Sequence, residues 1–86
     1  MVYLAITRPG YEEVRRHCED RQSTMWASSG ILSEEELATL RGAGWNVTVF
    51  TYSISPDDAV AVDRAMATIE QHHPSERIWV EGKGDA

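Results

Sequence analysis

Residues 33–52, SEEELATLRGAGWNVTVFTY, decide the fold because they encode a helix followed by a strand. Ser33, with Glu36 three residues later, is the capping-box pattern that opens a helix. The glycines at 42–44 provide a residue for the left-handed turn that ends it. The alternation over residues 46–52 is typical of a strand with one face more apolar than the other. This stretch therefore predicts one helix-then-strand unit.

A second unit of the same kind follows directly. Ser55-Pro56-Asp57-Asp58 opens a helix, and we expect Pro56 at its first helical position, where a fixed φ is favourable. Pro74 stops this helix before a short strand over residues 77–81. Helices that alternate with strands across short connections indicate a small α/β domain with a mostly parallel sheet.

The first part of the chain continues the alternation. Residues 2–6 are nearly all apolar, which is typical of a central strand covered on both faces. Apolar residues at helical spacing then predict a helix over about residues 10–21. Residues 24–27 indicate a second strand. The alternative is that residues 24–27 form no strand, or pair antiparallel at an edge, which would leave an open three-stranded sheet.

The resulting element order predicts three to four strands and three helices in a two- or three-layer sandwich. We expect residues 1–81 to form one domain and residues 82–86 to form a flexible tail. Right-handed crossovers limit how such a chain winds. Because residues 2–6 are the most continuously apolar strand and residues 77–81 the shortest, we favour the spatial order 2-1-3-4. This order is similar to the flavodoxin-like plan in topology alone, and it carries no functional residues with it.

Size and charge narrow the classes of function. A chain of 86 residues buries roughly 60 to 65% of its unfolded surface, so a partner subunit would stabilise it and we expect a homodimer. The net charge of −6 comes largely from acids at helix starts, where the helix dipole favours them. The basic residues form no block, which disfavours nucleic acid as a partner. With no apolar run of about 18 residues, no secretory signal and a single cysteine, we expect no membrane segment and a cytoplasmic location.

Candidate ligand-binding residues come from a rule for parallel α/β sheets, in which ligands bind outside the carboxyl ends of the strands. Hydroxyls, one guanidinium and helix N-termini at these ends suit an anion such as phosphate or carboxylate. The alternative interpretation is that the same residues cap helices and make turns. The residues that the rule selects are Thr7, Arg8, Ser28, Ser29, Gly30, Tyr52 and Ser53.

The sequence predicts no catalytic residue, no metal site and no cofactor. It contains neither Gly-rich phosphate-binding pattern. His17 and Cys18 are adjacent, so on one helix they point about 100° apart and do not form a working pair. His72 and His73 are interpreted as a helix end. Trp79, expected on a short edge strand, is a candidate anchor for a subunit interface.

Three functional hypotheses follow. The first is a small cytoplasmic protein that binds a partner, associates with itself and catalyses nothing. The second is a domain that binds a small molecule or anion at the carboxyl ends of the strands, with or without enzymatic activity. The third is an acidic inhibitor of a basic partner protein, of the type encoded on mobile elements.

Overall fold

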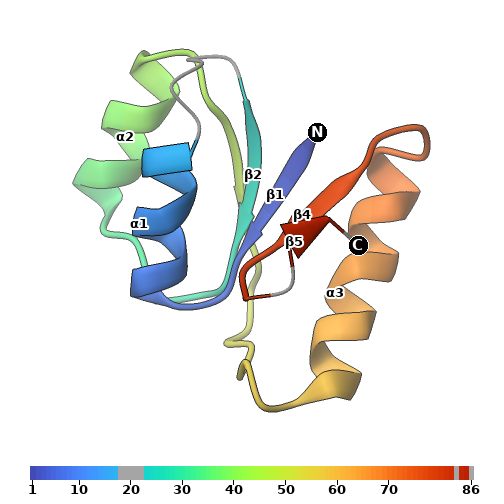
Figure 1. The fold of residues 1–86 in the computed structure, drawn as a ribbon. Helices are drawn as coiled ribbons and strands as arrows, with labels where there is room; N and C mark the ends of the chain where they lie inside the picture. Colours follow the sequence, from blue (N-terminus) through green and yellow to red (C-terminus); the bar gives the residue numbers. More distant parts are fainter. Residues whose placement is uncertain (18–22, 83, 86) are drawn as a thin grey trace.

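The computed structural model describes residues 1–17, 23–82 and 84–85, which form one five-stranded sheet with three helices. Figure 1 shows the sheet between the helices, with α1 and α2 on one face and α3 on the other. The α/β architecture predicted from the sequence is confirmed. The elements are β1 Val2–Ala5, α1 Arg8–His17, β2 Thr24–Ala27, α2 Glu34–Gly42, β3 Asn46–Val49, α3 Ala59–His72, β4 Ile78–Val80 and β5 Gly84–Asp85.

The strands lie in the order β3-β2-β1-β4-β5. β1 pairs in parallel with both β2 and β4, so that Leu4 is in register with Trp26 on one side and with Val80 on the other. β3 pairs in parallel with β2, whereas β5 pairs antiparallel with β4. Thr24–Ala27 is therefore a parallel strand inside the sheet, and the alternative of an antiparallel edge strand is wrong.

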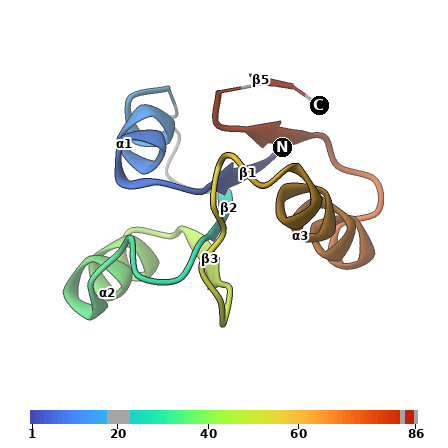
Figure 2. The ribbon, with the colours of Figure 1, turned by 90° about the horizontal axis from the view of Figure 1, so that it is seen from below.

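The favoured spatial order 2-1-3-4 is also wrong, because β3 lies beyond β2 and β4 lies beside β1. The physical reason is burial. All three residues of Ile78–Val80 are buried, as an internal strand requires, whereas Asn46–Val49 is exposed or half-buried at three of its four positions. Since right-handed crossovers that run in one direction put their helices on one face, α1 and α2 lie together and the returning α3 lies opposite (Figure 2).

The sheet separates two apolar clusters. On the face under α1 and α2, Tyr11 and Val14 from α1 and Leu40 from α2 form one apolar cluster with sheet residues that include Met25 and Trp79. The opposite face is covered by α3 alone among the described helices. Its core consists of Val2, Leu4, Ile6, Trp26, Phe50, Ile54, Val62, Ala65, Ile69, Ile78 and Val80. Burial of each large apolar side chain contributes about 1.5 to 3 kcal/mol to folding.

Two helix starts test the predicted capping. At α2 the capping box is confirmed, since Glu36 N–H donates to Ser33 Oγ (3.1 Å) and Ser33 N–H donates to Glu36 Oε1 (3.0 Å). The start of α3 differs from the prediction. Pro56 lies in a turn, and the helix begins only at Ala59, because Asp58 is the N-cap and accepts from the N–H of Ala61 (3.1 Å).

The chain ends also differ from the expected boundaries. α1 begins at Arg8, two residues earlier than predicted, and Cys18 lies outside the described residues. Gly84–Asp85, expected to belong to a free tail, pairs with β4 after a turn in which Gly82 has a φ of 78°. Within the described part of the chain, no helix has the length and apolar character needed to cross a membrane.

Candidate functional site

Glu81 occupies the crevice in which α/β sheets of this kind bind ligands. The strand order reverses between β1 and β4, and the rule for parallel sheets places a ligand outside their carboxyl ends. There the Glu81 carboxylate accepts hydrogen bonds from the N–H groups of Ile6 and Thr7 and from the Thr7 hydroxyl. A Cβ added at Gly10, in the first turn of α1, would overlap Glu81 Oε1. A carboxylate of the chain itself therefore fills the position that an external anion would take.

Arg8 is held at α2. Its two terminal nitrogens donate to both carboxylate oxygens of Glu36 at 2.7 and 2.6 Å, and the guanidinium lies 5.0 Å from the Tyr11 ring centre. These hydrogen bonds, followed by the one from the Ser33 N–H, lower the pKa of Glu36 from its usual 4.5 to about 2. Arg8 thus links α1 to the start of α2 and is already paired with a carboxylate.

The remaining predicted residues join the ends of β2 and β3. The buried Ser28 hydroxyl accepts from the N–H of Ile54 (2.8 Å). Ser29 N–H donates to the Tyr52 carbonyl (3.2 Å), and the Ser53 hydroxyl donates to the Ser29 carbonyl (3.4 Å). Gly30 has a φ of 87°, which suits the turn that follows β2. The seven predicted residues accordingly separate into three groups: Thr7 with Glu81, Arg8 with Glu36, and the loop residues Ser28, Ser29, Gly30, Tyr52 and Ser53.

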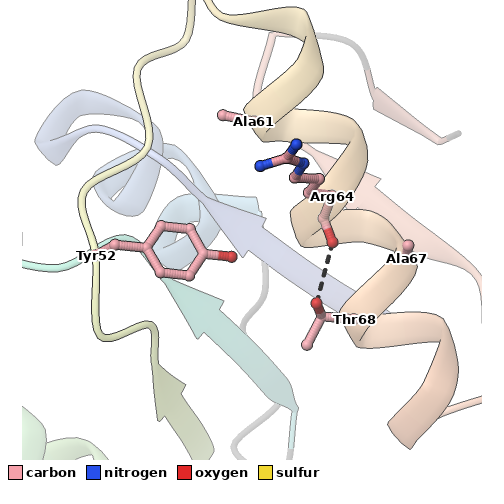
Figure 3. A pocket seen from close by; sticks show the side chains of 5 residues that line it. All are labelled: Tyr52, Ala61, Arg64, Ala67 and Thr68. Atoms are coloured by element: carbon pink, nitrogen blue, oxygen red, sulfur yellow. Dashed lines mark hydrogen bonds between the residues drawn. The ribbon is translucent and has the colours of Figure 1, made fainter.

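An open groove of about 510 Å³ lies between Tyr52 and the side of α3. The Tyr52 side chain is 44% exposed, and its hydroxyl points toward α3 (Figure 3). The guanidinium of Arg64 extends from α3 into the same space. The Thr68 hydroxyl donates to the Arg64 carbonyl at 3.0 Å. The groove is lined by Tyr52, Ala61, Arg64, Ala67 and Thr68.

A row of aromatic rings extends from Tyr52, which lines the groove, to the end of α3. The Tyr52 ring lies 5.3 Å from that of Phe50, and Phe50 lies 5.2 Å from Trp26. Trp26 in turn lies 5.3 Å from His72 at the end of α3. Because Phe50 and Trp26 are buried, this row fixes the wall of the groove that carries Tyr52. The Trp26 Nε1–H is buried and has no hydrogen-bond partner among the described residues.

Trp79 lies on an internal strand rather than at an edge. Its side chain is 8% exposed and packs 5.9 Å from the rings of Tyr3 and His17. Its proposed role as a subunit anchor stays a prediction, and it would require a change in this packing. The strand at one edge of the sheet is β3, which pairs with β2 on its inner side. On its outer side, Arg41 donates to the carbonyl of Val47 (2.9 Å).

A smaller cavity of about 280 Å³ lies between α1 and α2. It is lined by Tyr11, Arg15 and Glu36 together with Glu35 and Thr39. Two of its charged side chains are already engaged, since Arg15 donates to the Tyr11 hydroxyl (3.0 Å) and Glu36 accepts from Arg8 (2.7 Å). Within residues 1–17, 23–82 and 84–85, no three His, Cys, Asp or Glu side chains gather as metal ligands would. The groove is therefore the better candidate site.

Four of the five residues that line the groove are not among the residues predicted from the sequence. Ala61, Arg64 and Thr68 recur at helical spacing on the flank of α3, beside the buried stripe of Val62, Ala65 and Ile69. That spacing was the available signal, but such a flank normally faces solvent.

The sequence matches no protein-family model, no curated protein and no solved structure. The functional argument consequently rests on the geometry of the groove.

Proposed function

We propose that this chain is a small binding protein that catalyses no reaction, and that the groove between Tyr52 and α3 is its binding site. The observation that carries the proposal is the combination of a half-exposed aromatic ring, two alanine methyl groups and one guanidinium around a space of about 510 Å³. Ligand sites are typically concave and largely apolar, with a few polar groups that orient the ligand. The groove has this composition.

The strand ends are a weaker candidate for the same function. An external anion there would have to displace Glu81 from two backbone N–H groups and the Thr7 hydroxyl. Arg8 would have to leave its bidentate pair with Glu36. Because both cationic and N–H donors are already satisfied by carboxylates of the chain, these contacts are better explained as structural.

The lining of the groove supports binding rather than catalysis. Nucleophilic catalysis needs a nucleophile within hydrogen-bond reach of a base. The groove offers the hydroxyls of Tyr52 and Thr68 and the guanidinium of Arg64, and the Thr68 hydroxyl is engaged with the Arg64 carbonyl. Arginine remains protonated in proteins and is not a general base.

Self-association remains a second proposal, based on the small size of the chain. Two of the three large apolar side chains exposed on the described surfaces, Tyr52 and Val60, are 44% and 63% exposed and lie at the groove and at the start of α3; the third is Met1. The edge of β3 is less suitable, because the charged side chain of Arg41 occupies one of its outward carbonyls. A homodimer would accordingly compete with ligand for the α3 face.

The test is a thermal-shift screen of a metabolite library with two matched variants. Ala67→Trp fills the groove, whereas Ala38→Trp puts the same side chain on the exposed side of α2, across the sheet. We expect compounds that raise the melting temperature of the wild type and of Ala38→Trp, but not of Ala67→Trp, since a ligand stabilises only the state that binds it. Hits that persist in Ala67→Trp, or a library without hits, would contradict the proposal.

A further inference from the structure

We infer that the groove selects small organic monoanions in which a carboxylate is attached to an aromatic or compact apolar body, with Arg64 as the anchor of the carboxylate. The inference rests on the proposed function, since it names the ligand class of the same groove. It depends on three observations: the Arg64 guanidinium is unpaired among the described residues, the Tyr52 hydroxyl points toward α3, and the chain has a net charge of −6.

The Arg64 guanidinium is available to a ligand. It has no hydrogen bond or ion pair with any residue that the structure describes, and it extends into the groove (Figure 3). Three other arginines are engaged: Arg8 by Glu36, Arg15 by the Tyr11 hydroxyl and Arg41 by the Val47 carbonyl. A guanidinium presents parallel N–H donors that match the two oxygens of a carboxylate. Arg64 is thus a cation whose donors point into a cavity.

The neighbouring groups determine where a carboxylate would lie. The Tyr52 hydroxyl points toward α3 and supplies a second donor opposite Arg64 (Figure 3). The Thr68 hydroxyl already gives its proton to the Arg64 carbonyl, so it presents only lone pairs and repels a carboxylate oxygen. The carboxylate is therefore expected between Arg64 and Tyr52, on the side away from Thr68.

The apolar part of the ligand would pack against the apolar side chains of the groove. The Tyr52 ring and the methyl groups of Ala61 and Ala67 line the rest of the groove. A flat aromatic ring would stack or pack edge-on against Tyr52, and such aromatic pairs add to the stabilisation that burial alone provides. Burial of the Phe50 ring behind Tyr52 keeps this surface in position.

The charge of the ligand follows from the charge of the chain. The chain has a net charge of −6, and Arg64 is the single cation among the groove residues. One guanidinium balances one carboxylate, whereas a phosphate dianion would carry a second charge that the groove does not neutralise and the acidic chain repels. We therefore expect a monoanion to bind more tightly than a dianion of similar shape.

The experiment is an NMR titration of the ¹⁵N-labelled chain with phenylacetate, with the neutral phenylacetamide and with phenyl phosphate. The protein variants are Arg64→Ala, Arg64→Lys and, as a matched control that removes an exposed arginine from α1, Arg16→Ala. We expect phenylacetate to shift the amides of Tyr52, Ala61 and Thr68. Its affinity should fall at least about tenfold in Arg64→Ala, less in Arg64→Lys and by less than about twofold in Arg16→Ala, where tenfold corresponds to 1.4 kcal/mol.

The outcomes separate this inference from the proposed function. If phenylacetamide binds in the groove as tightly as phenylacetate, or if Arg64→Ala binds phenylacetate as well as the wild type, the carboxylate inference is overturned and the groove remains a binding site. Tighter binding of phenyl phosphate would likewise overturn the preference for monoanions. If none of the three compounds shifts the groove amides at millimolar concentration, the inference fails, and the proposed function then depends on the library screen.

Discussion

The Glu81 carboxylate accepts two hydrogen bonds from Thr7, one from its backbone N–H and one from its hydroxyl, each at 2.6 Å. The two residues are 74 positions apart in the sequence, and their contact ties the end of β4 to the end of β1. It also fills the crevice at which the strand order reverses. The crevice that binds a ligand in many sheets of this type is filled here by a contact that holds the central strand β1 to its neighbour β4.

The first prediction concerns the stability that Glu81 contributes. Glu81→Ala should lower the free energy of unfolding by about 1.5 to 3 kcal/mol, because hydrogen bonds to a charged, partly buried group are lost and N–H donors are left without a partner. Urea unfolding followed by tryptophan fluorescence measures this change. Glu70→Ala, on the exposed side of α3, is the control and should change stability by less than about 0.5 kcal/mol. Equal effects of the two substitutions would refute the structural role of Glu81.

The second prediction is that Gly10 and Glu81 are coupled. Gly10→Ala should destabilise the wild type by about 1 to 3 kcal/mol, since the new Cβ would overlap Glu81 Oε1 and break its hydrogen bonds. In the Glu81→Ala background the same substitution should be neutral or stabilising by up to about 1 kcal/mol, because Ala favours the helix. Gly42→Ala, with nothing within 4 Å of the added Cβ, is the matched control. A double-mutant cycle measures the coupling, and a Gly10→Ala effect of the same sign and size in both backgrounds would contradict it.

The third prediction concerns acid stability. The pKa of Glu36 is lowered to about 2 in the folded chain, so the unfolded chain binds the proton first as the pH falls. The stability that Glu36 contributes is therefore complete above pH 4.5 and is lost as the pH falls through about 2. Glu36→Gln, which keeps the capping-box shape, should reduce this dependence in urea titrations between these pH values. Glu35→Gln, in the same helical turn, should keep the wild-type profile, and an unchanged profile in Glu36→Gln would count against the Arg8 pair.

The fourth prediction concerns the exposed edge of the sheet. Arg41 covers the outward carbonyl of Val47 on β3, and a charged side chain at an edge hinders pairing with another chain. Arg41→Ala should increase self-association, seen as a rise in average mass with protein concentration in light scattering. Arg16→Ala removes the same charge elsewhere and should leave the mass unchanged. If Arg41→Ala behaves like this control, the edge is protected by something other than Arg41.

The sequence predicted the elements of the fold better than their arrangement. Local signals were sufficient for α2, where the capping box of Ser33 and Glu36 is present as predicted. The strand order depends on which strand is buried on both faces. The unbroken apolar triplet Ile78–Val80 indicates an internal strand, whereas the short length of the strand favours an edge position. Burial, not length, distinguishes an internal strand from an edge strand.

The candidate site was harder to predict for a related reason. The strand-end rule selected Thr7, but no local pattern indicates that Glu81 returns to it from the far end of the chain. Arg64 lies on a helix flank that faces solvent in most proteins. It becomes a groove residue only because α3 runs beside Tyr52, a contact set by the strand order.

The binding role of the groove is tested by screening the ¹⁵N-labelled chain against a library of small fragments and mapping the amide shifts on the structure. If the groove is the binding site, the shifted amides will cluster at Tyr52 and over residues 61–68 of α3. Shifts that cluster instead at Thr7, Gly10 and Glu81 would show that ligands displace the internal carboxylate, and they would contradict the assignment of the groove as the binding site.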